Sequence, residues 1–421
     1  MKILKRNPLP VVGCVILVLC LVFTSCSNDD DSSTDDTDTG EENENSDTYI
    51  MAAITGTEGD VYIINQNGDE LFSWDIDLAL GNDANLLEDG SLVVALKTAD
   101  AQITFGGYGG IIRKINTDKT TDWEITYAQG EEYMAHHDVE YLANGNILFP
   151  VWEKVSALDA ATAGFEENFD IYPEAIIEMN PLTEEIVWEW HSKDHLIQNY
   201  DATKANFGVV ADNPNKIDIN YNKAQDNGDL MHINGITLDE INDIIYVTVN
   251  NYSEVWVIDH STTTAEAATN SGGTYNLGGD LIYRFGNPLT YDNSGDVTLN
   301  LVHYPNLLEN GNMLVYGNEV YDNQSEVIEY QLNPPYQLVP GQDNEPSVVW
   351  SFTDPELYTA GLGGAVRMDN GNTLITEARA GTLWEVSEAG DIVQKYETNY
   401  STIWRAYVFS SDDPAITALG L

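Results

Sequence analysis

A strand pattern that recurs six times after residue 80 constrains the fold of this 421-residue chain more than any other feature. Runs of alternating apolar and polar residues, rich in β-branched and aromatic side chains, are separated by Asn-Gly and Pro turns, which indicates antiparallel strands. Each unit spans about 40 to 70 residues and holds about four strands, which is typical of a β-propeller blade. The six innermost strands are predicted to begin near residues 85, 136, 232, 303, 363 and 403.

The two ends of the chain predict how the ring closes. The last copy, at 403–409, has no outer strands after it, and a matching set stands near the start, at 60–74. A blade built from both termini would remove two exposed sheet edges. The sequence therefore predicts an all-β fold, a six-bladed β-propeller over residues 49–421. A seven-bladed ring and a large β-sandwich are the alternatives.

The first 26 residues have the features of an export signal. Basic residues precede an apolar run at 11–23 that is too short for a convincing membrane span. The run ends in Thr24-Ser25-Cys26, which resembles the lipobox of bacterial lipoproteins. We expect a lipoprotein signal peptide over 1–26, a lipid on Cys26, and a location in a Gram-negative cell envelope, at the periplasmic or outer surface of the outer membrane. The alternative is an ordinary secretory signal peptide.

Residues 27–48 and the overall charge exclude several functions. This segment holds ten acidic and no basic residues, so it is predicted to be a solvated tether. The net charge of −52, with 17 basic residues, excludes a nucleic-acid partner. Two of the three cysteines lie inside the signal segment and Cys26 is the lipidation site, so thiol catalysis, disulfides and cysteine metal sites are excluded from the propeller.

Three of the six copies begin with histidine, although the chain has only seven. Imidazole is neutral near pH 7 and can act as a nucleophile, an acid or a base, so His136 or His137, His232 and His303 are candidate catalytic residues. Only one of the neighbours His136 and His137 is expected to face the channel. The other histidines, His191, His195 and His260, fall in predicted outer strands or loops, where solvation is expected. Asp138, Asn144, Asn310 and Asn370 are interpreted as turn or strand-end residues.

Several of these segments resemble the arylsulfotransferase family, the PAPS-independent aryl-sulfate sulfotransferases with a six-bladed propeller fold. The similar segments are 136–148, 232–236, 257–259, 281–288, 303–314, 363–375 and 404–406. The resemblance implies a ping-pong transfer of a sulfuryl group from a phenolic sulfate donor to a phenolic acceptor, without PAPS or a metal cofactor. His303 matches the nucleophile that becomes sulfohistidine, and His232 with one of His136 and His137 matches the auxiliary histidines.

The sequence departs from the family at one position. Asn250 stands where the family has an arginine that grips the sulfate oxygens, and an amide carries no charge. A cation from another blade, Arg405, Arg379 or Arg367, is then needed. Arg405 is preferred because it follows Trp404, which can stack on an aromatic ring. Asn234 completes the predicted substrate-binding set of Arg405, Asn250, Asn234, Arg379 and Trp404.

Two other functions stay open. The loss of the arginine favours a non-catalytic surface lipoprotein that binds phenolic or glycan ligands in the propeller mouth. Three histidines could instead hold Zn²⁺, Mn²⁺ or Ca²⁺ in a lyase or hydrolase, although the resemblance makes a metal the weaker hypothesis. The sequence is compatible with a homodimer and does not fix the oligomeric state.

Overall fold

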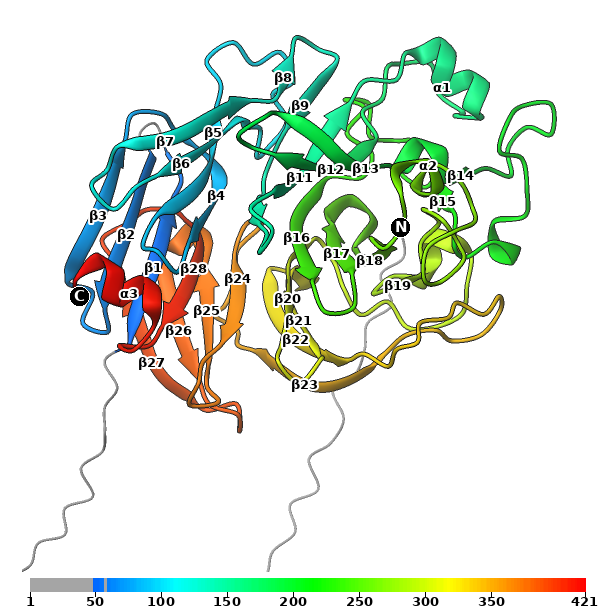
Figure 1. The fold of residues 1–421 in the computed structure, drawn as a ribbon. Coiled ribbons are helices and arrows are strands. Elements are labelled where there is room, and N and C mark those ends of the chain that lie inside the picture. The colour runs from blue at the N-terminus through cyan, green and yellow to red at the C-terminus, as the bar shows by residue number, and fades with distance from the viewer. Residues whose placement is uncertain (1–47, 57–58) are drawn as a thin grey trace, which may run out of the picture. The chain divides into compact units, whose positions relative to one another are not determined.

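The computed structural model describes residues 48–56 and 59–421, and the predictions for the signal peptide, for Cys26 and for the tether up to residue 47 lie outside them. Six antiparallel sheets are arranged around a central axis (Figure 1). The predicted all-β, six-bladed propeller is confirmed. Within the described residues, no helix is both long and apolar enough to span a membrane.

Blade 1 closes the ring with strands from both ends of the chain. Its strands, from the inside outward, are β28 (Ile403–Phe409), β1 (Tyr49–Ile54), β2 (Gly59–Asn65) and β3 (Glu70–Ile76). β1 and β28 pair in antiparallel register from Tyr49 opposite Phe409 to Ala53 opposite Arg405. The predicted closure is confirmed. The C-terminal helix α3 (Pro414–Leu419) then buries Ile416 in the core between blades 1 and 2.

The other five blades follow in chain order. Blade 2 contains β4 (Leu80–Leu86), β5 (Leu92–Lys97), β6 (Gly110–Ile115) and β7 (Thr121–Thr126). Blade 3 contains β8 (Ala128–Gln129), β9 (Tyr133–Ala135), β10 (Glu140–Tyr141), β11 (Ile147–Glu153), β12 (Glu174–Asn180) and β13 (Glu185–His191). Blade 4 contains β16 (Ile233–Asp239), β17 (Ile244–Val249), β18 (Glu254–Asp259) and β19 (Tyr283–Phe285). Blade 5 contains β20 (Val302–Leu307), β21 (Met313–Tyr321), β22 (Gln324–Gln331) and β23 (Ser347–Thr353). Blade 6 contains β24 (Gly364–Arg367), β25 (Thr373–Glu377), β26 (Thr382–Val386) and β27 (Ile392–Glu397).

Short elements lie in the connections between these strands. They are α1 (Ala157–Ala163), α2 (Thr264–Ala267), the paired strands β14 (Leu196–Ile197) and β15 (Ile217–Asp218), and the 3₁₀ helices η1 (Ser192–Asp194), η2 (Val210–Asp212), η3 (Asn250–Tyr252), η4 (Pro288–Tyr291) and η5 (Ala378–Ala380). Most of them belong to the two long insertions that interrupt the repeat between β11 and β16.

Period-two alternation places both faces of the inner strands in the core. In β5, Val94 and Leu96 join the apolar cluster shared with blade 1. Val93 and Ala95, which point the other way, join the cluster shared with blade 3. Each blade is therefore held between two neighbours by apolar burial, the dominant favourable term in folding.

The Asn-Gly-Asn turns have a structural role, as predicted for Asn144, Asn310 and Asn370. The side-chain oxygen of each accepts the amide of the residue two positions later, at 2.8 to 2.9 Å. The glycine between them has φ of 81° to 84°, a left-handed conformation that glycine adopts without steric cost. The second asparagine then donates to a glutamate on the blade's third strand, as Asn312 does to Glu329 at 2.6 Å.

A buried charge cluster ties four blades together at the channel. The Arg405 side chain is 1 % exposed, and its terminal nitrogens lie 3.4 Å from Asp83 and 3.3 Å from Asp138. Its guanidinium also lies 3.9 Å from the ring centroid of Tyr304. Asp138, interpreted from the sequence as a turn or strand-end residue, is therefore a partner in a buried ion pair. Such a pair adds little net stability, but removing one member leaves an uncompensated charge.

Of the three histidines expected in solvent, His195 is buried and His260 is only partly exposed. His195 is fully buried, because its Nδ1 lies 2.7 Å from Asp280 and its Nε2 lies 2.8 Å from the carbonyl oxygen of Ala267 in α2. His260 joins blades 3 and 4, since its ring nitrogens lie 2.6 Å from Asp243 and 3.0 Å from Glu178. The expectation of solvation was wrong for both.

Replacing Arg405 with methionine should destabilise the propeller by about 3–5 kcal/mol, because Asp83 and Asp138 would stay buried without their cation. Urea denaturation of the described domain measures this change. The control is Arg379→Met, which removes an exposed arginine of η5. Equal midpoints for the two variants would contradict the role of the cluster.

The bridge through His260 should weaken at high pH. Burial opposes its charge, but the hydrogen bonds to Glu178 and Asp243 outweigh burial and raise the pKa of His260. The stabilisation is therefore fully present below the ordinary imidazole pKa of about 6.5 and is lost as pH rises through the raised value. Wild type should exceed His260→Ala in free energy of unfolding by about 1–2 kcal/mol at pH 6, and the gap should shrink by pH 9. A gap independent of pH would contradict this prediction.

Candidate active site

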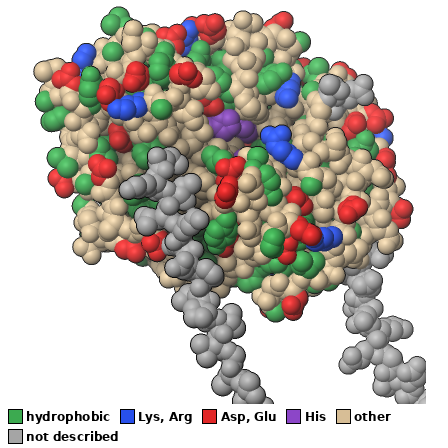
Figure 2. All heavy atoms as spheres, turned by 180° about the vertical axis from the view of Figure 1, so that it is seen from behind, with side chains coloured by type: hydrophobic (Ala, Val, Ile, Leu, Met, Phe, Trp, Pro, Cys, Tyr) green, Lys and Arg blue, Asp and Glu red, His purple; other side chains and the backbone are tan. Residues whose placement is uncertain are grey.

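The candidate histidines and Trp404 gather at one end of the inner strands. His303 lies at the start of β20, His232 directly precedes β16, and His137 follows β9. The ring centroids of His137 and His232 are 4.6 Å apart. The Trp404 ring lies 5.9 Å from His137 and 6.0 Å from His303. The space-filling view in Figure 2 shows histidine surface near the middle of one face, beside a Lys or Arg side chain.

The backbone at these histidines departs from regular strand geometry. His137, His232 and Tyr304 have φ of 57°, 62° and 51°. This left-handed conformation costs about 1 kcal/mol or more for such residues, and it clusters at functional sites in other proteins. The left-handed conformation of His137 also sends the side chains of His136 and His137 in different directions. The His137 ring lies against His232, whereas the His136 ring stacks on Trp152, with ring centroids 3.7 Å apart.

His303 is held as a neutral ring with a known tautomer. Asn318 donates both side-chain hydrogens to the carbonyls of Thr359 and Leu362, so its oxygen faces His303 Nδ1 at 2.5 Å and must accept from an N–H there. The lone pair therefore lies on Nε2, which accepts the Leu362 amide at 3.1 Å. Burial, with the nearby charges of His232 and Arg405, lowers the pKa of His303 to about 3 despite the Asn318 bond.

The surroundings of His232, unlike those of His303, favour the protonated form of its ring. Its Nδ1 lies 2.5 Å from Asp229, at the end of the second insertion. Burial opposes protonation, but the charge and hydrogen bond of Asp229 outweigh it and raise the pKa of His232. Its side chain is 17 % exposed, so a ligand could reach this ring.

The two predicted substrate-binding asparagines contact the protein backbone. Asn234 and Asn250 both donate to the carbonyl of Val302, at 2.9 and 3.1 Å. They thus fix the peptide group directly before His303. The binding of substrate by either amide stays a prediction.

The predicted arginines lie in different surroundings. Both terminal nitrogens of Arg405 contact carboxylates, and among the described residues only its Nε has no partner. Arg367 pairs with Glu329 at 2.6 Å. Arg379 is exposed on η5, near Gly361 of the loop that carries Leu362. Sulfate binding by Arg405 or Arg379 also stays a prediction.

Lys97 is a cation that the sequence did not single out. Its amide donates to Ala79, as the Asn250 amide donates to His232, so the two residues hold equivalent positions in blades 2 and 4. Its Nζ lies 4.8 Å from the ring centroid of Tyr108, and burial lowers its pKa. Comparing strand ends between blades would have found this position.

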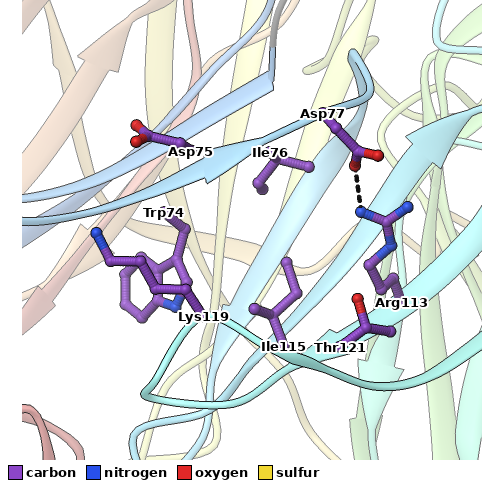
Figure 3. A pocket seen from close by; sticks show the side chains of 8 residues that line it. All are labelled: Trp74, Asp75, Ile76, Asp77, Arg113, Ile115, Lys119 and Thr121. Carbon is purple, nitrogen blue, oxygen red and sulfur yellow. Dashed lines mark hydrogen bonds and ion pairs between the residues drawn. The ribbon is translucent and has the colours of Figure 1, made fainter.

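Two cavities lie away from the histidines. One, of about 260 Å³, is lined by Trp74, Arg113 and Lys119 between blades 1 and 2, and Figure 3 shows the pair of Arg113 with Asp77 at its edge. The other, of about 240 Å³, lies beside α1 and is lined by Lys154 and other residues. None of the candidate residues lines either cavity.

The metal hypothesis finds no ligand set in this part of the chain. Across 48–56 and 59–421, no three His, Cys, Asp or Glu side chains are arranged to hold a metal ion. The nearest histidines instead bond to each other, because the Nδ1 atoms of His136 and His137 lie 2.9 Å apart. A three-histidine metal site is therefore not supported.

Sequence reasoning missed four partners of the histidines: Glu174, Asp229, Asn318 and Leu362. Asp229 stands three residues before His232, and a search for Asp-x-x-His spacing would have found it. Asn318 lies within the second strand of blade 5, at a position equivalent to Asn250 in blade 4, because its amide donates to Leu301 just before β20 as the Asn250 amide donates to His232 just before β16. Glu174 and Leu362 come from distant strands and loops and leave no local signal.

Gly107 should be required for the placement of His137. A Cβ atom there would lie 2.0 Å from His137 Nε2, and the residue has φ of 76°. Gly107→Ala should therefore cost about 1–3 kcal/mol more than Gly311→Ala, whose φ is 81° but whose Cβ would meet nothing within 4 Å. Urea denaturation and histidine ¹⁵N spectra check this, and equal stabilities with unchanged His137 signals would contradict it.

Comparisons with known proteins identify the family. The family described as Arylsulfotransferase (ASST) matches residues 83–399, which include all four candidate histidines. No curated protein matches the chain. Among solved structures, a protein of unknown function from Bacteroides caccae is 13 % identical, with 86 % of this chain and 99 % of that chain covered and a TM-score of 0.49. A putative 6-phosphogluconolactonase from Bacteroides fragilis is 11 % identical, with 87 % and 99 % covered and a TM-score of 0.45. Because the family match spans about three quarters of its length, the chain belongs to the arylsulfotransferase family.

Proposed function

We propose that this family member moves a sulfuryl group from a phenolic sulfate ester to a phenolic acceptor, in a ping-pong reaction through a sulfohistidine on His303. The observation that carries the proposal is the state of His303. It is a buried, neutral imidazole whose Nδ1–H is fixed by Asn318, so its lone pair is on Nε2. A neutral imidazole nitrogen is the form that can attack sulfur near pH 7.

In the first half-reaction, Nε2 forms a bond to sulfur while the bond from sulfur to the phenolic oxygen breaks. Leu362 must move for this to occur, because its amide occupies the Nε2 lone pair. Gly361 and Gly363 flank it and allow that movement, and the released N–H can donate to a sulfuryl oxygen. In the second half-reaction, the acceptor oxygen attacks sulfur and the N–S bond breaks.

The sulfuryl oxygens need a positive charge, and His232 supports that role. Its pairing with Asp229 keeps the ring protonated and partly exposed beside His137. An imidazolium here offers one charged N–H in place of the guanidinium that Asn250 lacks. The cation matters because a net charge of −52 repels an anionic ester at long range.

The setting of the reaction is also a proposal. A lipid on Cys26 would anchor the enzyme to the outer membrane, and the acidic residues after it would separate the propeller from the bilayer. The histidine itself carries the group, so the reaction needs neither PAPS nor a metal. A homodimer is compatible with this arrangement.

A second function is favoured by two observations. The Nε2 lone pair of His303 is already occupied, and Asn250 replaces the arginine. A propeller that only binds phenolic or glycan ligands at this mouth would need neither a free Nε2 lone pair on His303 nor an arginine in place of Asn250.

Release of nitrophenol from p-nitrophenyl sulfate, with phenol as acceptor and without PAPS or metal, tests the proposal. Turnover should depend on phenol and fall by roughly 10³-fold or more in His303→Ala. His191→Ala, which removes a partly exposed histidine from β13, the outermost strand of blade 3, is the control. Mass spectrometry of trapped enzyme should find one sulfuryl group on the His303 peptide. Saturable binding of phenolic sulfates without turnover would instead establish the binding function.

A further inference from the structure

A chain of hydrogen bonds runs from the candidate site into blade 3. His137 Nδ1 lies 2.9 Å from His136 Nδ1, and His136 Nε2 lies 2.8 Å from Glu174 Oε2. The other oxygen of Glu174 accepts the Ile233 amide at 2.8 Å. All three side chains are buried, and Glu174 has no exposed surface. The sulfotransfer steps proposed above do not use Glu174 or His136.

The chain has two proton arrangements, because the facing Nδ1 atoms share one hydrogen. In the first, Glu174 is ionised, His136 donates to it through Nε2, and His137 donates through Nδ1, which leaves a lone pair on His137 Nε2. In the second, Glu174 is protonated, both bonds are reversed, and His137 carries its hydrogen on Nε2. The two arrangements differ by one proton, and both histidines stay neutral in each.

We propose that Glu174 stores the proton that the two half-reactions exchange. This proton travels to and from the phenolic oxygen through His136 and His137. This inference rests on the proposed sulfotransfer. His137 would then be the catalytic acid and base, while Glu174 acts through it.

The proton balance closes over one turnover. As the O–S bond of the donor breaks, His137 Nε2 gives its proton to the phenolate, the hydrogens of both bonds shift, and Glu174 is left ionised. As the acceptor attacks sulfohistidine, its phenolic proton goes to His137 Nε2, the shifts reverse, and Glu174 is protonated again. The enzyme returns to its starting state, and no other reactant is consumed.

The electrostatic surroundings agree with this proton store. Burial raises the pKa of Glu174 well above its usual value and lowers the pKa of both histidines. A proton in the chain therefore rests on the carboxyl rather than on an imidazole. The charged or titratable groups that face the chain are His232, Asp229, His303 and Arg405. Stacking on Trp152 holds the His136 ring between its two partners.

Glu174→Gln locks the chain in one arrangement. The Ile233 amide requires an acceptor, so the glutamine must keep its oxygen there and direct its NH₂ to His136 Nε2. His136 must then donate through Nδ1, and His137 must keep its hydrogen on Nε2. The variant keeps the shape of the site, but His137 can no longer take or give a net proton.

Glu178→Gln is the matched control. Glu178 lies on the same strand, is also buried, and also bonds a histidine, His260, but it does not connect to His137. Both variants lose one buried carboxylate, so a general loss of stability should affect both.

The proposal predicts a selective defect in Glu174→Gln. The nitrophenol burst from p-nitrophenyl sulfate should be retained, because its leaving group is a stable anion that needs no proton. Burst formation from phenyl sulfate and transfer to phenol should each fall by about 10²–10⁴-fold. Transfer should recover at high pH, where phenolate needs no base. Equal rate losses of Glu174→Gln with p-nitrophenyl sulfate and phenyl sulfate, or transfer rates equal to those of Glu178→Gln, would overturn the relay. His232 would then be the proton carrier.

Histidine ¹⁵N shifts test the relay without relying on turnover. With Glu174 protonated at rest, wild type and Glu178→Gln should carry the hydrogens on His137 Nε2 and His136 Nδ1. Both proteins should move them to His137 Nδ1 and His136 Nε2 as pH rises through the ionisation of Glu174, whereas Glu174→Gln should keep the first arrangement at every pH. Wild-type tautomers that do not change with pH, or that change equally in Glu174→Gln, would overturn the proposal. Absence of any transfer in wild type, with the tautomers switching as expected, would instead refute the sulfotransfer and leave the proton chain established.

Discussion

The antiparallel pairing of β28 with β1 is the interaction on which the rest of the structure depends. It joins the last strand of the ring to the first, and β28 carries both Trp404 and Arg405. Trp404 reaches His137 and His303 only in the closed ring, and Arg405 reaches Asp83 across 322 positions of sequence. The candidate site is therefore assembled by long-range closure, whose entropic cost the apolar burial between blades offsets.

Charge in this acidic chain is controlled by pairing. The guanidinium of Arg405 is surrounded by Asp83 and Asp138, which makes it a structural cation. The pairing with Asp229 favours a positive charge on His232, which is partly exposed in the candidate site. An arginine would carry its charge at any working pH, whereas this charge lasts only up to the raised pKa of one histidine. In the proposed sulfotransfer, anion binding would then depend on a carboxylate from an insertion, because Asn250 stands in place of the arginine.

The sequence predicted what repeats and missed what connects the repeats. Strand periodicity and the turns predicted six blades and the closure, and the repeat position of the histidines predicted that His232 and His303 meet one of His136 and His137. It could not give side-chain directions, because left-handed residues such as His137 and Tyr304 break the alternation on which such predictions rest. Nor could it give Glu174 or Asn318, since a partner for a buried polar group is selected in three dimensions. The burial of His195 was missed for the same reason, because its partners Asp280 and Ala267 lie far from it in the sequence.

Burial is the largest single influence on the protonation of His303 and of Glu174. Removing an imidazole from water disfavours its charged form, so His303 keeps a lone pair on Nε2. Removing a carboxyl from water also disfavours its charged form, so Glu174 tends to hold a proton. The same desolvation thus favours the neutral forms of both groups, which are the forms that the proposed nucleophile and the proposed proton store require. His232 is the exception, because Asp229 supplies a compensating charge that favours its protonated form, the cation that the proposed sulfotransfer would use.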